Sequence, residues 1–261
     1  MDIQVQPRPV RAFERGLAVL ATLNRLGTAT ALELARASGV PRATVYRLLQ
    51  TLLDEGYVAR SPSDDRFRLR LKVRSLSEGF EDEHWISGVA APALLALTQR
   101  ILWPCDVATL EGTRMVIRET THRSAPLSID RNMVGVRLPL LESTMGLAYL
   151  AFAPDAERAA LLRLLAASTA PEDALARNPA AVTRRIVATR RLGYGLRQGG
   201  PLWSHTGSIA LPLRCRGRVV GCVAVIWMAR AIRQEEGVRQ CLEPLRETAH
   251  AIEAGLEAEA G

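Results

Sequence analysis

Residues 31–56 read ALELARASGVPRATVYRLLQTLLDEG and predict two short helices joined by a tight turn. In the second half of this stretch the apolar side chains recur at the spacing of a helix with one buried stripe, namely at Val45, Leu48, Leu49 and Leu52. Gly39 lies between the two helices and is expected to take a positive φ. A short helix, a glycine turn and a second amphipathic helix indicate a helix-turn-helix.

The next residues, 57–71, predict a hairpin with two unlike faces. Tyr57 and Val58 begin a strand, residues 61–65 have the composition of a turn, and apolar side chains then alternate at Phe67, Leu69 and Leu71. The residues between them are cationic: Arg66, Arg68, Arg70 and Lys72. Such a hairpin suits a wing that grips the DNA backbone, so the stretch predicts a winged helix-turn-helix with one helix in the major groove. The alternative is a two-helix packing unit with a solvated basic hairpin.

The polar face of the second helix suits base edges and phosphates, because it carries hydrogen-bond donors, an aromatic ring and a small residue. The predicted DNA contacts are Arg42, Ala43, Thr44, Tyr46, Arg47 and Gln50 of this helix and Arg66 and Arg68 of the wing. Residues 1–75 hold 13 Arg and Lys against 7 Asp and Glu, whereas the remaining 186 residues hold 21 against 20. Nearly all of the net charge of +7 therefore lies on the N-terminal part, which indicates a polyanionic partner.

Composition excludes several other classes of protein. The chain has 261 residues, 48% of them hydrophobic, which is enough for two ordinary domains with real cores. The four cysteines lie far apart without a CxxC pair, so the sequence signals no metal site and no disulfide framework. The longest apolar run, residues 219–229, is too short to cross a bilayer, and the polar N-terminus does not resemble a signal peptide. We expect a cytoplasmic protein with no membrane partner and no cofactor.

The chain divides into three expected parts with an α+β fold class. Residues 1–72 form the DNA-binding domain, in which a first helix marked by Phe13, Leu17, Leu20 and Leu23 covers the back of the helix-turn-helix. Residues 73–84 form a charged linker helix whose Leu76 and Phe80 make a short apolar ridge, which is either a dimer seam or a surface that packs on its own domain. Residues 85–261 are mixed. Helices are expected at 86–101, from Ser143, at 156–167, 178–193 and 234–257, and strands at 105–110, 115–121, 127–130, 208–213 and 219–228. The last strand is apolar on both faces, which predicts a central position in its sheet.

At this point the chain resembles the IclR-type bacterial transcription regulators over nearly its whole length. The resemblance is carried by LELARASGVPRATVYRLL (32–49), the wing (57–71), VGVRLPL (134–140), LGYG (192–195) and GRVVGCVAV (217–225). Four further stretches resemble a narrower branch that contains activators of 3-(3-hydroxyphenyl)propionate catabolism: RSPSDDRFRL (60–69), LSEGF (76–80), WPCDVATL (103–110) and RETTHR (118–123).

The resemblance implies a winged helix-turn-helix, a linker helix and a GAF-like effector-binding domain with an antiparallel sheet. It also implies a homodimer or a homotetramer on a palindromic double-stranded DNA operator, with a small organic acid as effector. An activator of this kind would have RNA polymerase as a further partner.

Carried over position by position, the effector pocket of the family falls at Leu138, Ser143, Thr144, Met145, Arg197, Ser208, Ala224 and Ile226. Small-acid sensors of the family tend to have serines where this chain has Ala224 and Ile226, so the resemblance favours a larger, aromatic acid.

The residues themselves add to this site. Ser143 and Thr144 begin a helix whose N-terminus attracts a carboxylate, or they simply cap it. His122 follows a strand and could bond a ring hydroxyl, while Trp103 and Met133 could line an apolar slot; a surface histidine and core packing are the alternatives. Trp203 belongs to a Gly- and Pro-rich loop that could cover the slot or be an ordinary exposed loop. The candidate cations for a carboxylate are Arg118, Arg123, Arg131, Arg137 and Arg197.

Three functions remain to be separated. The first is a DNA-binding regulator that senses a small aromatic carboxylic acid of the hydroxyphenylpropionate kind and controls an aromatic catabolic operon. The same kind of regulator with a different small organic acid as effector is an alternative. The second is a DNA-binding scaffold whose C-terminal domain only oligomerises. The third is an enzyme with Cys222 as nucleophile, which the sequence disfavours because Cys222 lies within an apolar strand and no catalytic motif is present. We therefore predict no enzymatic activity and no catalytic residues.

Overall fold

The computed structural model describes residues 9–77, 84–128, 130, 132–200 and 203–259. The chain divides into two compact units, Met1–Glu81 and Asp82–Gly261. Among the described residues no helix is long and apolar enough to cross a membrane.

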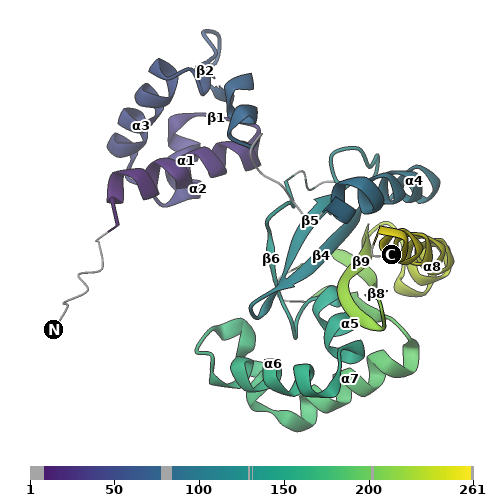
Figure 1. Cartoon of the computed structure of the whole chain (residues 1–261). Helices are drawn as coiled ribbons and strands as arrows, with labels where there is room; N and C mark the ends of the chain where they lie inside the picture. The colour runs from purple at the N-terminus through teal and green to yellow at the C-terminus, as the bar shows by residue number, and fades with distance from the viewer. Residues whose placement is uncertain (1–8, 78–83, 129, 131, 201–202, 260–261) are drawn as a thin grey trace. The chain divides into compact units, whose positions relative to one another are not determined.

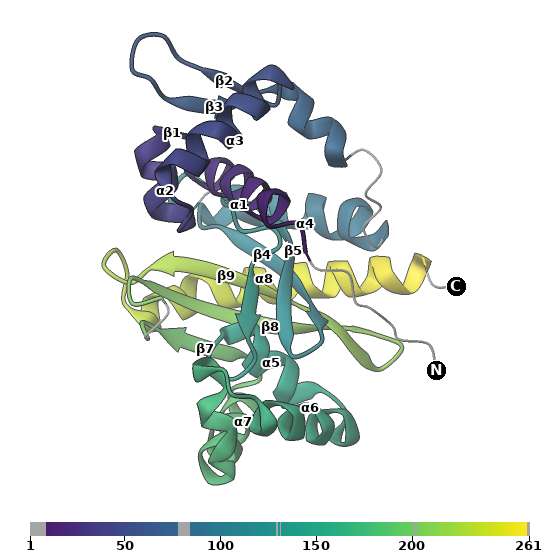
Figure 2. The same cartoon turned by 90° about the vertical axis from the view of Figure 1, so that its left-hand side faces the viewer.

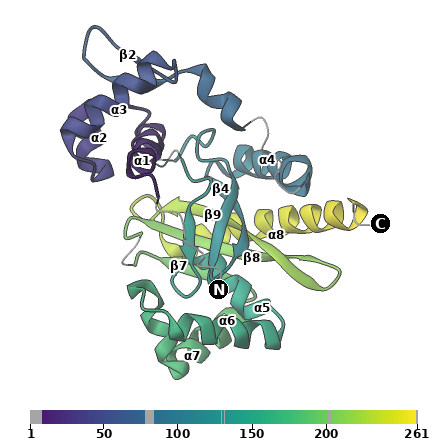
Figure 3. The same cartoon turned by 60° about the vertical axis from the view of Figure 1, so that its left-hand side comes forward.

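The N-terminal unit is a three-helix domain with a small antiparallel sheet (Figure 3). Its elements are α1 (Arg11–Leu26), β1 (Thr28–Ala29), α2 (Ala31–Ser38), α3 (Arg42–Asp54), β2 (Val58–Arg60) and β3 (Phe67–Leu69), and the strand order is β1-β3-β2. Thr30 and Glu33 form a capping box that starts α2, and Gly39 ends it with a φ of 70°. The predicted winged helix-turn-helix is confirmed.

The core of this unit corrects two expectations. Val19, Leu23, Val45 and Leu49 are buried, but Phe13 is 67% exposed and Leu17 is 52% exposed. The inward stripe of α1 follows Gly16, Val19 and Leu23, because a turn of 100° per residue places Phe13 and Leu17 on its flank. The expectation that Phe13 and Leu17 pack against the helix-turn-helix is therefore wrong.

The end of the wing is shorter than expected. β3 ends at Leu69, and a 3₁₀ helix spans Leu71–Ser77. Leu71 is 77% exposed, so it does not continue the buried face of the strand as predicted. Leu76 of the expected linker ridge is 61% exposed, whereas its other member, Phe80, lies outside the described residues.

The C-terminal unit is built around a six-stranded antiparallel sheet (Figure 2). Its order is β6-β5-β4-β9-β8-β7, with bounds β4 (Cys105–Glu111), β5 (Arg114–Thr120), β6 (Arg137–Pro139), β7 (Gly195–Gln198), β8 (Thr206–Cys215) and β9 (Arg218–Met228). β9 lies between β4 and β8, which confirms its predicted central position. Cys222 and Ala224 pack on one face of the sheet, and Val223 and Val225 pack on the other.

Helices cover both faces of this sheet (Figure 1). One face packs against a π-helical turn (Ile86–Ala90), α4 (Ala91–Ile101) and α8 (Gln234–Glu259), and the other packs against α5 (Thr144–Phe152), α6 (Asp155–Ala167), a 3₁₀ helix (Pro171–Arg177) and α7 (Pro179–Leu192). The expected strand at 127–130 is wrong: Leu127 lies in a turn, Ser128 and Asp130 are irregular, and Ser128 N–H donates to Ala125 O at 3.3 Å. The short strands β6 and β7 were not expected.

Candidate functional site

The predicted recognition helix α3 exposes the side chains expected to meet DNA. Arg42, Ala43, Tyr46, Arg47 and Gln50 are exposed, and Thr44 is half-buried. The guanidinium of Arg42 lies 5.5 Å from the centre of the Tyr46 ring, and Gln50 donates a hydrogen bond to Asp54 at 2.8 Å. The buried stripe of Val45 and Leu49 holds this polar face outward, so its donors are available to base edges and phosphates.

The two predicted cations of the wing differ in their surroundings. Arg68 is exposed on β3. Arg66 lies 3.0 Å from Glu33 of the capping box, and its charge is partly neutralised. The Thr30 backbone N–H, and after it the charge of Arg66, keep the pKa of the Glu33 carboxyl below its usual value. Arg68 therefore offers its charge to a phosphate at less cost than Arg66.

A cavity lies beside the N-terminus of α5, on the sheet face that α5, α6 and α7 cover. Its empty volume is about 500 Å³, including the part that is open to solvent. Ten of its lining residues were expected from the sequence: His122, Met133, Leu138, Ser143, Thr144, Met145, Arg197, Ser208, Ala224 and Ile226. They come from the loop between β5 and β6, from β6, from the start of α5, and from β7, β8 and β9, which the fold brings together.

Trp103 is the exception among the expected effector residues. It is 4% exposed and packs in the hydrophobic cluster of α4 and α8, on the opposite face of the sheet. Alternate residues of an extended chain point to opposite faces, so Trp103 lies on the same side as Cys105 and Val107, while Asp106 faces the cavity. The expected contact between Trp103 and a ligand is therefore corrected to a core contact.

Five further residues complete the lining: Asp106, Ile117, Asp130, Trp203 and Thr206. Of these, only Trp203 was considered from the sequence, as part of a loop. Asp106 could have been identified from the sequence, because a single carboxylate between apolar residues of a buried strand requires a partner or a function. Asp130 and Thr206 lie in loops or at a strand end, where no periodic pattern identifies the inward residues.

One end of the cavity is formed by the start of α5. Ser143 is its N-cap and accepts a hydrogen bond from Gly146 N–H at 3.0 Å, and the Thr144 and Ser208 hydroxyls are hydrogen-bonded to each other. Gly195 of β7 approaches so closely that a Cβ there would lie 2.3 Å from the Thr144 carbonyl oxygen. The first N–H groups of a helix and its dipole make this end favourable for an anion.

Arg197 lies at the same end, and both of its terminal nitrogens already donate hydrogen bonds within the protein. Its Nη1 donates to the carbonyl oxygens of Gly199 at 2.8 Å, Trp203 at 3.0 Å and Thr206 at 3.1 Å, and its Nη2 donates to Thr206 Oγ1 at 2.9 Å. The guanidinium also stacks 5.3 Å from the Trp203 ring. Burial lowers the pKa of Arg197 to about 10, so it remains cationic at neutral pH. Arg197 contributes a positive charge to this end while its hydrogen bonds hold the 199–206 loop.

Three of the other candidate cations do not line the cavity. Arg118 donates to Thr109 at 2.8 Å, Arg123 donates to Asn132 at 2.6 Å, and Arg137 donates to Glu111 at 2.5 Å. Arg131 lies outside the described residues. Arg197 and the start of α5 are therefore the positive features of the described cavity.

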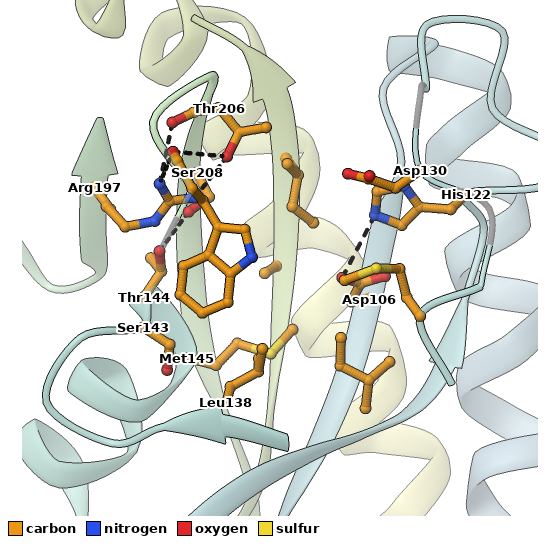
Figure 4. A pocket seen from close by; sticks show the side chains of 15 residues that line it. Asp106, His122, Asp130, Leu138, Ser143, Thr144, Met145, Arg197, Thr206 and Ser208 are labelled. Atoms are coloured by element: carbon orange, nitrogen blue, oxygen red, sulfur yellow. Dashed lines mark hydrogen bonds and ion pairs between the residues drawn. The ribbon is translucent and has the colours of Figure 1, made fainter. Parts of the chain in front are cut away.

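The opposite end is formed by His122, Asp106 and Asp130 (Figure 4). His122 and Asp106 are both 3% exposed. His122 Nδ1 lies 2.6 Å from Ser128 Oγ, while His122 Nε2 lies 3.7 Å from Asp106 Oδ2 and has no hydrogen-bond partner among the described residues. Asp106 Oδ1 accepts a hydrogen bond from Thr120 at 2.6 Å.

Apolar side chains separate these two ends, among them Ile117, Leu138, Met145 and Ile226. A cavity with a cationic end, an apolar middle and an acceptor-rich end suits a flat molecule with a carboxylate at one end. Cys222 does not support nucleophilic chemistry, because burial raises the pKa of its thiol and its Sγ donates to the Met145 carbonyl at 3.3 Å. All four cysteines are free thiols.

Comparison with known proteins identifies both units. Residues 12–62 match the IclR helix-turn-helix domain, and residues 82–254 match the bacterial transcriptional regulator IclR C-terminal domain. The chain is 28% identical to the DNA-binding transcriptional repressor YiaJ of Escherichia coli (strain K12), over 95% of this chain and 88% of YiaJ. It is 31% identical to the Pca regulon regulatory protein of Pseudomonas putida, over 57% of this chain and 51% of that protein.

A solved structure resembles the whole chain. It is an IclR homologue from Microbacterium hydrocarbonoxydans in complex with 4-hydroxybenzoate, with 26% identity and a TM-score of 0.61. The match covers 95% of this chain and 99% of that chain.

Proposed function

Because this chain belongs to the IclR family of bacterial transcriptional regulators, which are not enzymes, we propose that its C-terminal unit senses a small aromatic carboxylic acid and so controls DNA binding. The observation that carries this proposal is the cavity beside α5, whose walls are apolar and whose one end is positive. The 4-hydroxybenzoate bound by the Microbacterium relative supports an aromatic acid as the ligand class.

In the proposed complex the carboxylate lies at the first turn of α5. There it accepts hydrogen bonds from backbone N–H groups near Ser143 and Thr144, in the field of Arg197. The ring occupies the apolar middle, where Ala224 and Ile226 of β9 leave space and contribute no hydroxyl. The resemblance to activators of 3-(3-hydroxyphenyl)propionate catabolism makes hydroxyphenylpropionates the first acids to test.

The proposed DNA contacts are the exposed side chains of α3 with Arg68, and with Arg66 in so far as DNA displaces Glu33. We propose residues 1–72 as the DNA-binding domain, 73–84 as a linker helix and 85–261 as the effector-binding and oligomerisation domain. As a homodimer or homotetramer, the protein would bind a palindromic operator of an aromatic catabolic operon. As an activator, it would act there with RNA polymerase.

Regulation then follows from a difference in the affinity of the acid for two arrangements of the oligomer. If the acid binds one arrangement of the oligomer more tightly than another, it shifts the population toward that arrangement and changes how the DNA-binding domains are presented. An acid with equal affinity for both arrangements would bind without regulating.

A thermal-shift and calorimetric panel on the full-length protein tests the ligand class. The panel contains benzoate, 3-phenylpropionate, 3-(3-hydroxyphenyl)propionate, pyruvate and glyoxylate. We expect the aromatic acids to bind and to stabilise the C-terminal unit by about 2.7 kcal/mol at 100 times their Kd. Binding of pyruvate or glyoxylate in preference to every aromatic acid would contradict the proposal, and binding of none would favour a scaffold that only oligomerises.

A further inference from the structure

The acceptor-rich end of the cavity contains a histidine whose proton can be placed from its surroundings. Ser128 Oγ donates its one proton to the Asp130 carbonyl oxygen, at 2.9 Å. The same Oγ lies 2.6 Å from His122 Nδ1 and can therefore only accept from that nitrogen. In the neutral imidazole Nδ1 therefore carries the ring proton, and Nε2 presents a lone pair.

This lone pair faces a second acceptor. His122 Nε2 lies 3.7 Å from Asp106 Oδ2, and two acceptors cannot bond to each other. The other Asp106 oxygen, Oδ1, is held by the Thr120 hydroxyl at 2.6 Å. His122 Nε2 is buried without a partner among the described residues, which is unfavourable unless a bound group donates to it.

The two ends of the cavity also fix the direction of a bound acid. Asp106 and Asp130 lie at the end of His122, whereas Arg197 and Thr144 lie across the cavity from them (Figure 4). Repulsion by the two carboxylates keeps a ligand carboxylate away from His122 and directs it to the start of α5. The far end of the ligand, which is the end opposite its carboxylate, therefore reaches His122.

We propose that His122 Nε2 accepts a hydrogen bond from a hydroxyl group on the far end of the ligand. This inference rests on the proposed function, and it narrows the ligand class from aromatic acids in general to ring-hydroxylated acids. An acid without a hydroxyl leaves the buried Nε2 unpaired, so the site selects by hydrogen bonding as well as by size.

Calorimetry with three matched acids tests this selection on the full-length protein. The probes are 3-(3-hydroxyphenyl)propionate, its methoxy counterpart, which has the oxygen without the proton, and 3-phenylpropionate, which has neither. We expect the hydroxy acid to bind about tenfold more tightly than either of the others. Equal affinities for the hydroxy acid and 3-phenylpropionate would overturn this inference while leaving the proposed function standing. Binding of none of the three would overturn both.

Variants of the cavity test whether His122 causes the preference for the hydroxy acid. His122→Phe should reduce the preference for the hydroxy acid to about twofold or less and should keep the affinity for 3-phenylpropionate. Met133→Leu, a conservative change in the apolar wall, is the matched control and should alter both affinities by the same factor. A full preference retained by His122→Phe would exclude His122 as the acceptor.

A measurement on the unmutated protein does not depend on how a variant folds. The chain has four histidines, so ¹⁵N-imidazole NMR can resolve them individually. We expect one ring to hold its proton on Nδ1, and its Nε2 resonance to shift when the hydroxy acid is added but not with the methoxy acid. A proton on Nε2 of His122, or tighter binding of an aminomethyl analogue than of the hydroxy acid, would assign this end to a different ligand group and overturn the inference.

Discussion

Individual arginines in this protein differ in role because their partners differ. Arg197 is surrounded by three loop carbonyl oxygens and a threonine hydroxyl, whereas Arg47 projects from an exposed helix face. The sequence predicted that both belong to binding sites. It could not predict that the terminal nitrogens of Arg197 donate to this loop, because most of the acceptors are backbone atoms whose positions depend on the path of residues 199–206.

Arg47→Ala should weaken operator binding by about 1–3 kcal/mol and relax sequence preference, if Arg47 contacts a base edge. Fluorescence anisotropy with the operator and with a scrambled duplex measures both effects. An equal loss on the two duplexes would instead assign Arg47 to the phosphate backbone.

Arg114→Leu should destabilise the C-terminal unit by about 3–5 kcal/mol, because it leaves a buried carboxylate unpaired. Arg114 Nη1 lies 2.8 Å from Asp173, which is only 2% exposed, and the hydrogen bonds to Asp173 raise the pKa of Arg114. All four tryptophans lie in this unit, so urea unfolding followed by tryptophan fluorescence reports it alone.

The matched control for Arg114 is the double variant Arg114→Leu/Asp173→Leu, which removes both charges together. It should lose less stability than Arg114→Leu. A double variant as unstable as the single one would show that the carboxylate is not the source of the cost.

Among whole elements, those with strong local signals were predictable. α7 begins at a proline after the Asn178 cap and ends at Gly193, and the structure confirms this helix. β6 and β7 were missed because three or four residues are too few to show a period of two. The cavity was largely predictable through the family resemblance, but the wrong side was assigned to Trp103 because the strand register was unknown.

We expect the wing to contribute to DNA binding through its positive charge alone. Arg68→Ala is expected to lower the slope of log K against log salt by about one unit, since one phosphate contact is lost. Titrations of the operator at four salt concentrations give this slope. Arg66→Ala is the comparison and should change it less, because Glu33 already pairs with Arg66 at 3.0 Å. An unchanged slope in Arg68→Ala would remove Arg68 from the backbone contacts.

Gly195→Ala should disturb the junction of β7 and α5, where the new Cβ would lie 2.3 Å from the Thr144 carbonyl oxygen. We expect a loss of about 1–3 kcal/mol in the stability of the C-terminal unit, together with weaker acid binding, since the first turn of α5 must move. Gly88→Ala in the same unit is the control, because the nearest atom to its Cβ lies at an ordinary 3.5 Å. Equal unfolding midpoints for the two variants would contradict this account of Gly195.

At the scale of the whole molecule, charge and core are divided between two units. The N-terminal unit has its own buried cluster, and residues 1–77 hold 13 Arg and Lys against 7 Asp and Glu, a net charge of +6. Residues 82–261 hold 21 against 18, a net charge of +3 on a much longer chain. A fragment of residues 1–77 should therefore bind duplex DNA in dilute buffer, and a fragment of residues 82–261 should not. Mobility-shift assays on the two fragments test this division; no shift with the first fragment would refute it.

The sheet of the C-terminal unit divides that unit in a second way, since the cavity occupies one side and a closed core fills the other. Alternate residues of the same strand therefore line the cavity and pack in the closed core. If the cavity binds the proposed acid, replacing Ala224 or Ile226 of β9 should change the ligand preference, whereas replacing Val223 or Val225, which face the closed core, should change only the stability of the unit. On the proposed function, related proteins could therefore acquire a different ligand through substitutions that leave the closed core unchanged.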